Sequence, residues 1–139
     1  MITGRYPSLR LRRNRKYSWT RRLIRENELS SNDLILPIFL MEGKNKKKEI
    51  KSMPGISRYS IDMLPKVIDK ALKNKIPMIA FFPYTQNNKK NIFATEALNE
   101  NNLVCKAIQL AKKRYKNEIG VMSDIALDPY TSHGHDGLI

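Results

Sequence analysis

Apolar segments of strand length alternate with segments of helical period along most of this sequence. Strands are predicted at residues 34–40, 78–82 and 119–125, and each of these runs is apolar on both faces. Strands of that kind are typical of a parallel sheet whose faces are covered by helices. The order strand, helix, strand, helix, strand therefore predicts an α/β fold.

Two helices are predicted between the strands. The first begins near residue 61, with Ser60 as a candidate N-cap, and ends near Asn74. The second follows Asn101 or Asn102 and ends in a basic turn, which suits the negative end of the helix dipole.

The segments that connect these elements contain residues typical of turns and loops. Residues 53–60 predict turns because they contain Pro and Gly, and residues 85–91 predict a polar loop. A shorter helix is predicted before the first strand, at residues 18–27, with Ser18 as its N-cap.

The predicted strands recur at a nearly constant interval, since they begin at residues 34, 78 and 119. Eight units of this length need roughly 300 residues, within the range of a (β/α)8 barrel. The chain has 139 residues, which leaves room for a basic N-terminal arm over residues 1–32 and three β/α units over residues 33–139. We therefore expect an incomplete (β/α)8 TIM barrel, truncated after the third strand and its loop.

The chain is strongly basic, with a formal net charge of +13 at pH 7. Residues 1–51 hold 14 Lys or Arg against 5 Asp or Glu. Two clusters make this excess: Arg10, Arg12, Arg13, Arg15, Lys16, Arg21, Arg22 and Arg25 in the arm, and Lys44 with Lys46, Lys47 and Lys48 after the first strand. Such an arm fits a small nucleic-acid-binding protein, because cations release counterions from phosphate. The favoured interpretation is a solvated arm or a subunit contact.

The composition excludes several classes of protein. Cys105 is the single cysteine, so an intramolecular disulfide framework and a cysteine-rich zinc module are ruled out. The longest apolar runs are much shorter than the ~20 residues that span a bilayer, and no secretory signal is visible. We expect a reduced, cytoplasmic setting without a membrane.

Many polar side chains that could take part in catalysis or metal binding lie in the loop after the third strand. Asp124 ends the strand, and residues 128–136 read DPYTSHGHD. Ligands of parallel α/β proteins bind at the carboxyl ends of strands, where such carboxylates can transfer protons or hold a hard cation. Each residue taken singly also fits a structural turn.

The same loop resembles a known family. Residues 123–137 (SDIALDPYTSHGHDG) are similar to the N-terminal part of 5-aminolevulinate dehydratase, or porphobilinogen synthase. The resemblance also covers residues 10–13 (RLRR), 33–39 (DLILPIF), 42–43 (EG), 52–55 (SMPG), Arg58 and residues 60–62 (SID). The resemblance implies a (β/α)8 barrel, usually in a homo-octamer, whose N-terminal arm embraces a neighbouring subunit. It also implies the condensation of two 5-aminolevulinate molecules to porphobilinogen, with loss of two waters, in haem biosynthesis.

The resemblance assigns roles to individual residues. Asp124 matches the catalytic aspartate, and Phe82 and His135 match positions beside the substrate. Ala126, Asp128 and Asp136 stand where zinc-using members have three cysteines, so a catalytic zinc is not expected. Asp128 and Asp136 are candidate metal ligands, and magnesium is expected for the full-length type, with its main metal site outside this loop.

The family's two Schiff-base lysines lie on later strands, and none is present in this chain. Lys66, Lys70 and Lys73 are expected on the exposed side of an early helix. We therefore expect the chain alone to be inactive. Three hypotheses remain: a fragment of the enzyme, an inactive remnant that binds intact subunits through its arm, and a small basic nucleic-acid-binding protein.

Overall fold

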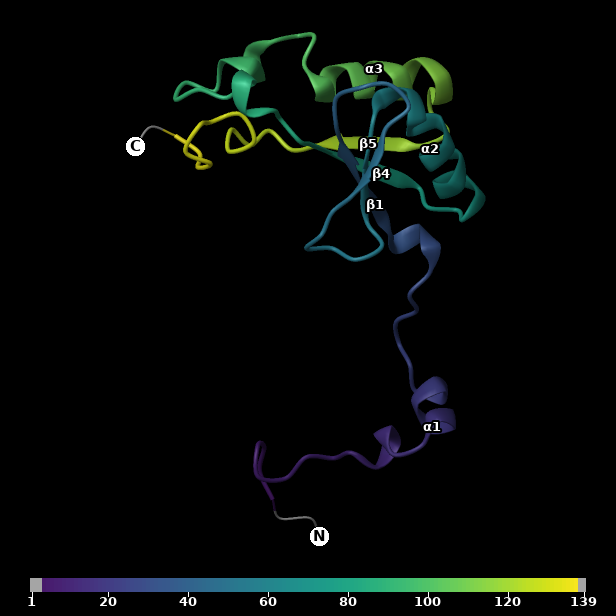
Figure 1. Ribbon diagram of the computed structural model, residues 1–139. Helices are drawn as coiled ribbons and strands as arrows, with labels where there is room; N and C mark the ends of the chain where they lie inside the picture. Colours follow the sequence, from purple (N-terminus) through teal and green to yellow (C-terminus); the bar gives the residue numbers. More distant parts are fainter. Residues whose placement is uncertain (1–3, 138–139) are drawn as a thin grey trace. The chain divides into compact units, whose positions relative to one another are not determined.

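The computed structural model describes residues 4–137, which belong to two compact units, Met1–Ser30 and Ser31–Ile139 (Figure 1). The first unit contains a 3-10 turn, η1 (Arg13–Arg15), and a short helix, α1 (Ser18–Leu23). Neither element buries a residue. The described part of this unit therefore has no core of its own.

Helix α1 is shorter than the predicted helix at residues 18–27. It ends at Leu23, and Ser18 lies inside it; Tyr17 occupies the N-cap position, with no side-chain cap. The prediction of Ser18 as N-cap was wrong. A helix of six residues that buries nothing depends on local hydrogen bonds alone, so nothing extends it to residue 27.

The second unit is an α/β domain. Its strands are β1 (Ile35–Leu40), β2 (Lys47–Glu49), β3 (Ser57–Tyr59), β4 (Met78–Pro83) and β5 (Gly120–Ser123), and its helices are α2 (Leu64–Lys73) and α3 (Leu103–Tyr115). The strand order in the sheet is β2-β3-β1-β4-β5. Strands β3, β1, β4 and β5 are parallel, and β2 is antiparallel to β3. The α/β prediction with a parallel sheet is confirmed.

The core lies between the sheet and the two helices, which lie on the same side of β1 and β4 (Figure 1). Alternate residues of the strands face the helices and are buried. The buried strand and helix residues are Ile38, Leu40, Ile79, Phe81, Leu64, Ile68, Ala71, Val104, Ala107, Ala111 and Tyr115. The residues between them on each strand therefore face the opposite side of the sheet.

Tyr115 joins the two helices. Its hydroxyl donates to Asp69 at 2.6 Å and lies 3.1 Å from the carbonyl oxygen of Pro65. Burial, together with the Asp69 carboxylate, raises the pKa of Tyr115 to about 12. The phenol therefore stays neutral and keeps α3 fixed on α2.

The N-termini of α2 and α3 differ in how they are capped. Of the two candidates Asn101 and Asn102, Asn102 caps α3, because its side chain accepts from the amide of Cys105 at 2.8 Å. Ser60 does not cap the next helix: a 3-10 turn (Ile61–Met63) precedes α2, and the Ser60 hydroxyl accepts from the amide of Lys46 instead.

The segment predicted as turns, residues 53–60, contains strand β3. Its backbone pairs with β1 on one side and with β2 on the other. Both short strands were missed because three polar or mixed residues give no periodic signal, and the pairing that holds them is tertiary. The third predicted strand is also shorter than residues 119–125, since Ile125 is 94% exposed and lies outside β5.

Within residues 4–137, no helix is both long and apolar enough to cross a membrane.

Candidate functional site

A cavity of about 290 Å³ lies at the carboxyl ends of the central strands. Strands β1 and β4 contribute Phe39 and Phe82, and the segment after β5 contributes Asp124. The complete lining is Phe39, Arg58, Phe82, Pro83, Tyr84, Asp124, Ala126, Asp128, Pro129 and Tyr130. The fold thus brings together three of the five predicted site residues.

The apolar wall of the cavity comes from the sheet face opposite the helices. Phe39 pairs in register with Phe82, and their ring centroids are 5.7 Å apart. Their strand neighbours Ile38 and Phe81 are buried in the core, so alternation turns both Phe rings toward the cavity. The two rings therefore form the apolar side of the cavity.

Asp124 is the first residue after β5. Its Oδ1 atom accepts from the amide of Ala126 at 3.2 Å. No described residue donates to Oδ2, so this oxygen can accept a hydrogen bond or a proton from a bound molecule. Asp128 lines the same cavity from the following turn.

Asp136 has a different position from the other carboxylates. Its Oδ1 atom accepts from the amides of Leu127 and, at 2.9 Å, of Asp128. It therefore closes the loop on itself and does not line the cavity. This hydrogen bonding positions Asp128.

His135 also lies outside the cavity lining. Its side chain is exposed, and its ring stacks on His133 with centroids 6.3 Å apart. The backbone carbonyl of His135 accepts from the Thr131 hydroxyl at 2.9 Å. In this structure its backbone helps to shape the loop, and its role beside the substrate stays a prediction.

The loop does not provide a metal site among the described residues. No group of three His, Cys, Asp or Glu side chains within residues 4–137 could hold a metal ion. Ala126 has no ligating atom, and the Asp136 carboxylate already accepts two backbone amides. The expectation that a catalytic zinc is absent stays a prediction, supported by the lack of a thiolate at Ala126, Asp128 and Asp136.

Lysine is absent from the described lining of the cavity. Lys66, Lys70 and Lys73 are exposed on α2, as expected. Lys89, in the loop after β4, pairs with Glu42 and with Glu96 at 3.5 Å. The Glu42 partner raises the pKa of Lys89, so this amine stays protonated and is not a nucleophile.

Two residues of the lining were not predicted. Arg58 and Tyr84 contact each other, with the guanidinium carbon 4.4 Å from the ring centroid. Arg58 lies in the segment predicted as turns, and only the pairing of β3 with β1 brings it to the cavity. Arg58 belongs to the family resemblance, three residues after the SMPG motif, and that signal could have singled it out.

Replacing Asp136 by alanine is expected to loosen this loop. The amides of Leu127 and Asp128 would lose their shared acceptor, and their hydrogen exchange should accelerate at least about tenfold, since a buried or shared hydrogen bond is worth about 1.5 kcal/mol when the acceptor is charged. The matched control is Asp128→Ala, which removes a carboxylate that accepts no hydrogen bond from the described residues of the loop. Equal exchange in both variants would show that Asp136 does not hold the loop.

Fold and site together define a class: part of a (β/α) barrel whose carboxylate-bearing cavity lies at the carboxyl ends of its strands. The chain belongs to the delta-aminolevulinic acid dehydratase family, whose family model matches residues 8–139.

Individual relatives agree with this assignment. The chain is 52% identical over 132 residues to the delta-aminolevulinic acid dehydratase of Bradyrhizobium diazoefficiens, covering 95% of this chain and 37% of that protein. It is 40% identical to the enzyme of Chlamydia pneumoniae, with 94% and 39% covered. The chain thus spans less than half the length of these relatives.

A solved structure supports the fold. The crystal structure of delta-aminolevulinic acid dehydratase (porphobilinogen synthase) from Toxoplasma gondii ME49, in complex with the reaction product porphobilinogen, superposes with a TM-score of 0.82 at 35% identity. The match covers 99% of this chain and 37% of that chain. The described α/β unit is therefore consistent with a partial barrel.

Proposed function

We propose that this chain supplies the first strands and one wall of the active site of a porphobilinogen synthase. Such an enzyme condenses two molecules of 5-aminolevulinate to porphobilinogen with loss of two waters, in tetrapyrrole biosynthesis. The observation that carries the proposal is the position of Asp124, directly after β5 and in the lining of a strand-end cavity, in a chain of this family.

Asp124 would move protons during the condensation. Loss of two waters requires protons to reach two departing oxygens and to leave carbon and nitrogen. The Ala126 amide fixes Oδ1 of Asp124, which leaves Oδ2 for exchange with a substrate amine. The rings of Phe39 and Phe82 form the apolar side of the same cavity, and in the whole enzyme such a surface would keep water from the carboxylate and strengthen its electrostatic effect.

The nucleophiles would come from elsewhere in the whole enzyme. Each Schiff base needs a lysine amine with a depressed pKa, and the described lining contains no lysine. Lys89 is held protonated by Glu42 and Glu96. We therefore place both Schiff-base lysines outside residues 4–137 and expect the chain alone to make no porphobilinogen.

The proposal includes a metal and a partner. Magnesium, held outside the described loop, fits a family member whose loop has Ala126, Asp128 and Asp136 in place of cysteines. The arm would bind a neighbouring subunit of a homo-octamer. In support, the first unit exposes large apolar side chains and has no described core, as expected of a segment that packs on a partner. We further propose a cytoplasmic setting, in keeping with the free thiol of Cys105.

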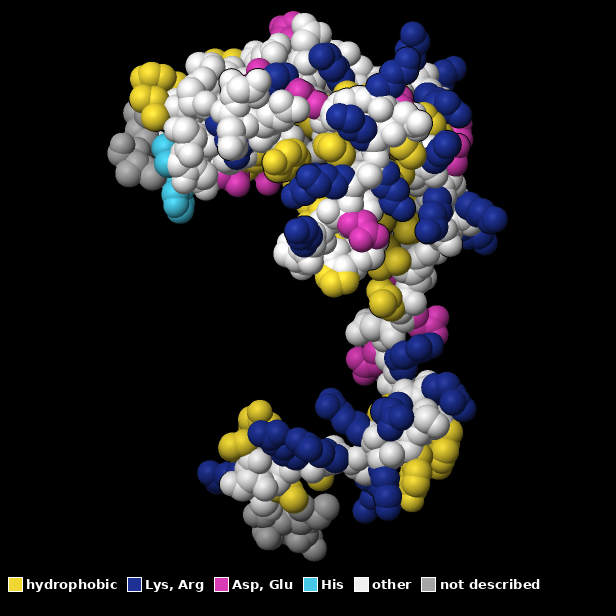
Figure 2. Space-filling model, in the orientation of Figure 1, with side chains coloured by type: hydrophobic (Ala, Val, Ile, Leu, Met, Phe, Trp, Pro, Cys, Tyr) yellow, Lys and Arg dark blue, Asp and Glu magenta, His cyan; other side chains and the backbone are white. Residues whose placement is uncertain are grey.

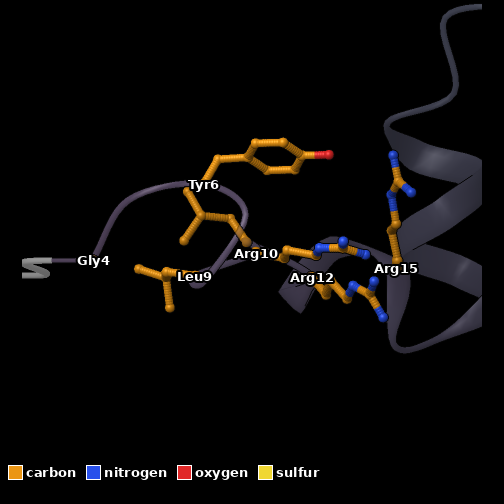
Figure 3. A pocket seen from close by; sticks show the side chains of 7 residues that line it. Gly4, Tyr6, Leu9, Arg10, Arg12 and Arg15 are labelled. Carbon is orange, nitrogen blue, oxygen red and sulfur yellow. The ribbon is translucent and has the colours of Figure 1, made fainter.

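A nucleic-acid role for the arm is the weaker alternative. Figure 2 shows Lys and Arg side chains gathered on the first unit, and residues 4–25 contain no Asp or Glu. Arg10, Arg12 and Arg15 line one hollow there with Tyr6 (Figure 3). No comparison supports this alternative, and basic side chains suit a subunit contact equally.

The test is a hybrid barrel. Residues 1–139 are fused to the remaining part of the Bradyrhizobium diazoefficiens relative, which is 52% identical over the matched region. The hybrid is expected to form porphobilinogen from 5-aminolevulinate, and the 139-residue chain alone is not. A folded hybrid without activity, or activity of the chain alone, would contradict the proposal.

A further inference from the structure

Two loops lie side by side beyond the carboxyl ends of the central strands (Figure 1): residues 84–102, after β4, and residues 124–137, after β5. Asn91 joins the two loops through its backbone. Its amide donates to the carbonyl oxygen of Tyr130 at 3.2 Å, and its carbonyl oxygen accepts from the amide of Ser132 at 3.1 Å. Two segments that are far apart in the sequence are therefore bridged at this position.

The bridge lies directly beside the lining of the strand-end cavity. The residue opposite Asn91 is Thr131, which is buried, and the residue before it, Tyr130, is buried and lines the cavity. The amides of Tyr130 and Thr131 donate to the carbonyl oxygen of Leu127 at 2.8 and 3.1 Å, which closes a turn that contains Asp128. Asp128 lines the same cavity. The bridge to Asn91 therefore helps to fix the turn that carries the Asp128 carboxylate.

The Asn91 side chain holds its own loop in shape. Its Oδ1 atom accepts from the amides of Phe93 at 3.0 Å and Thr95 at 3.3 Å, and its Nδ2 atom donates to the Thr95 hydroxyl at 2.6 Å. These contacts enclose Ala94, whose φ of 52° lies in the left-handed region that alanine seldom adopts. One side chain thus supports a backbone conformation that Ala94 does not favour by itself.

Hydrophobic burial and ion pairs contribute less to fixing this segment. Ile92 and Phe93 are 53% and 68% exposed, so their packing stabilises the loop little. Lys89 pairs with Glu42, after β1, and with Glu96, but ion pairs that are open to solvent are weak. The Asn91 side chain is therefore the main local support of the bridge.

We propose that Asn91 is a positioning residue: its side chain fixes the loop after β4, and the bridge then sets where Asp128 and Tyr130 stand in the cavity lining. Asn91 is not part of that lining, so it acts through the loop after β5 and not on a bound molecule. The inference rests on the proposed function, because it takes the cavity as the place where 5-aminolevulinate reacts. It adds a residue outside the cavity to those on which the reaction depends.

Amide hydrogen exchange of the 139-residue chain tests whether the side chain holds the bridge. Asn91→Ala keeps the backbone carbonyl that accepts from Ser132, so a purely local effect would leave the Ser132 amide protected. We expect exchange at Ser132 to accelerate about tenfold, because the lost side-chain hydrogen bonds release the loop. Amides in the middle of β4 should keep their protection. Unchanged exchange at Ser132, or equal acceleration throughout β4, would overturn the role of Asn91.

Two further variants separate the side chain of Asn91 from loop mutations in general. Asn91→Asp keeps Oδ1 as an acceptor and can accept from the Thr95 hydroxyl through Oδ2, so Ser132 should stay protected. The matched control is Asn99→Ala. Asn99 accepts from the amide of Asn101 at 3.0 Å in the same loop, but among the described residues no hydrogen bond joins it to the loop after β5. Faster exchange at Ser132 in this control, equal to that in Asn91→Ala, would contradict a specific role of Asn91.

The hybrid barrel tests the consequence for the reaction. Asn91→Ala is expected to raise KM for 5-aminolevulinate about tenfold with little change in kcat, since apparent affinity falls with the fraction of molecules whose lining is in place. A mere loss of folded protein would instead lower the apparent kcat and leave KM unchanged. Asn91→Asp should restore KM, and Asn99→Ala should not change it.

The outcomes separate this inference from the proposed function. An active hybrid whose KM does not change on Asn91→Ala would overturn the positioning role and leave the proposed function standing. If the hybrid is inactive while exchange at Ser132 depends on Asn91 as expected, the proposed function fails and the role of Asn91 in placing the loop stands.

Discussion

A hybrid barrel with Asp124→Asn is expected to form porphobilinogen about 100 to 10,000 times more slowly than the same hybrid with Asp124, the usual contribution of general acid–base catalysis. Asparagine has nearly the same shape, and its amide oxygen can still accept from the Ala126 amide that now bonds Oδ1. It cannot take up or release a proton at pH 7. The substitution therefore removes the chemistry and keeps the geometry.

The measurement is the initial rate of porphobilinogen formation at saturating 5-aminolevulinate. The matched control is Glu100→Gln, which also changes a carboxylate to an amide, but at an exposed position outside the cavity. This control should keep the full rate. An Asp124→Asn hybrid that retains more than a tenth of the rate would exclude proton transfer by Asp124.

The second large effect concerns stability. Phe81→Ala is expected to lower the free energy of unfolding by about 4 kcal/mol, because it removes an aromatic side chain from a close-packed core. The Phe81 side chain is completely buried between the sheet and the two helices. A domain whose total stability is about 5 to 15 kcal/mol would lose a large part of it.

Phe93→Ala provides the same chemical change at the surface, where the residue is 68% exposed. Its effect should stay within about 0.5 kcal/mol. Urea unfolding followed by circular dichroism gives both values. Similar midpoints for the two variants would mean that the core around Phe81 is not formed in solution.

The sequence predicts the elements that are long and periodic. Strands β1 and β4 and helix α3 each contain enough apolar positions to show a period. The Asn102 cap of α3 is also a local feature, because it depends on neighbouring residues only. Strands β2 and β3 have three residues each, and their stability comes from pairing with distant segments. No local pattern can report such pairing.

The same distinction between local and tertiary signals applies to the residues of the site. Asp124, Phe82 and Asp128 could be placed because each follows or ends a recognisable strand in a resemblance of high specificity. The resemblance includes Arg58, but its position in the cavity lining could not be inferred, since that position depends on which residue of β3 is paired with Phe39. The outward position of His135 depends on the path of the loop, which hydrogen bonds of Asp136 and Thr131 determine.

Those hydrogen bonds affect the order of folding events. Asp136 contacts amides eight and nine positions earlier in the chain, and Thr131 contacts the carbonyl of His135. Loops of about ten residues close in roughly 10 to 100 ns, and closing so short a segment costs little chain entropy compared with pairing distant strands. The loop after β5 can therefore become ordered early, as a local unit, and pack on the sheet with its carboxylates already arranged.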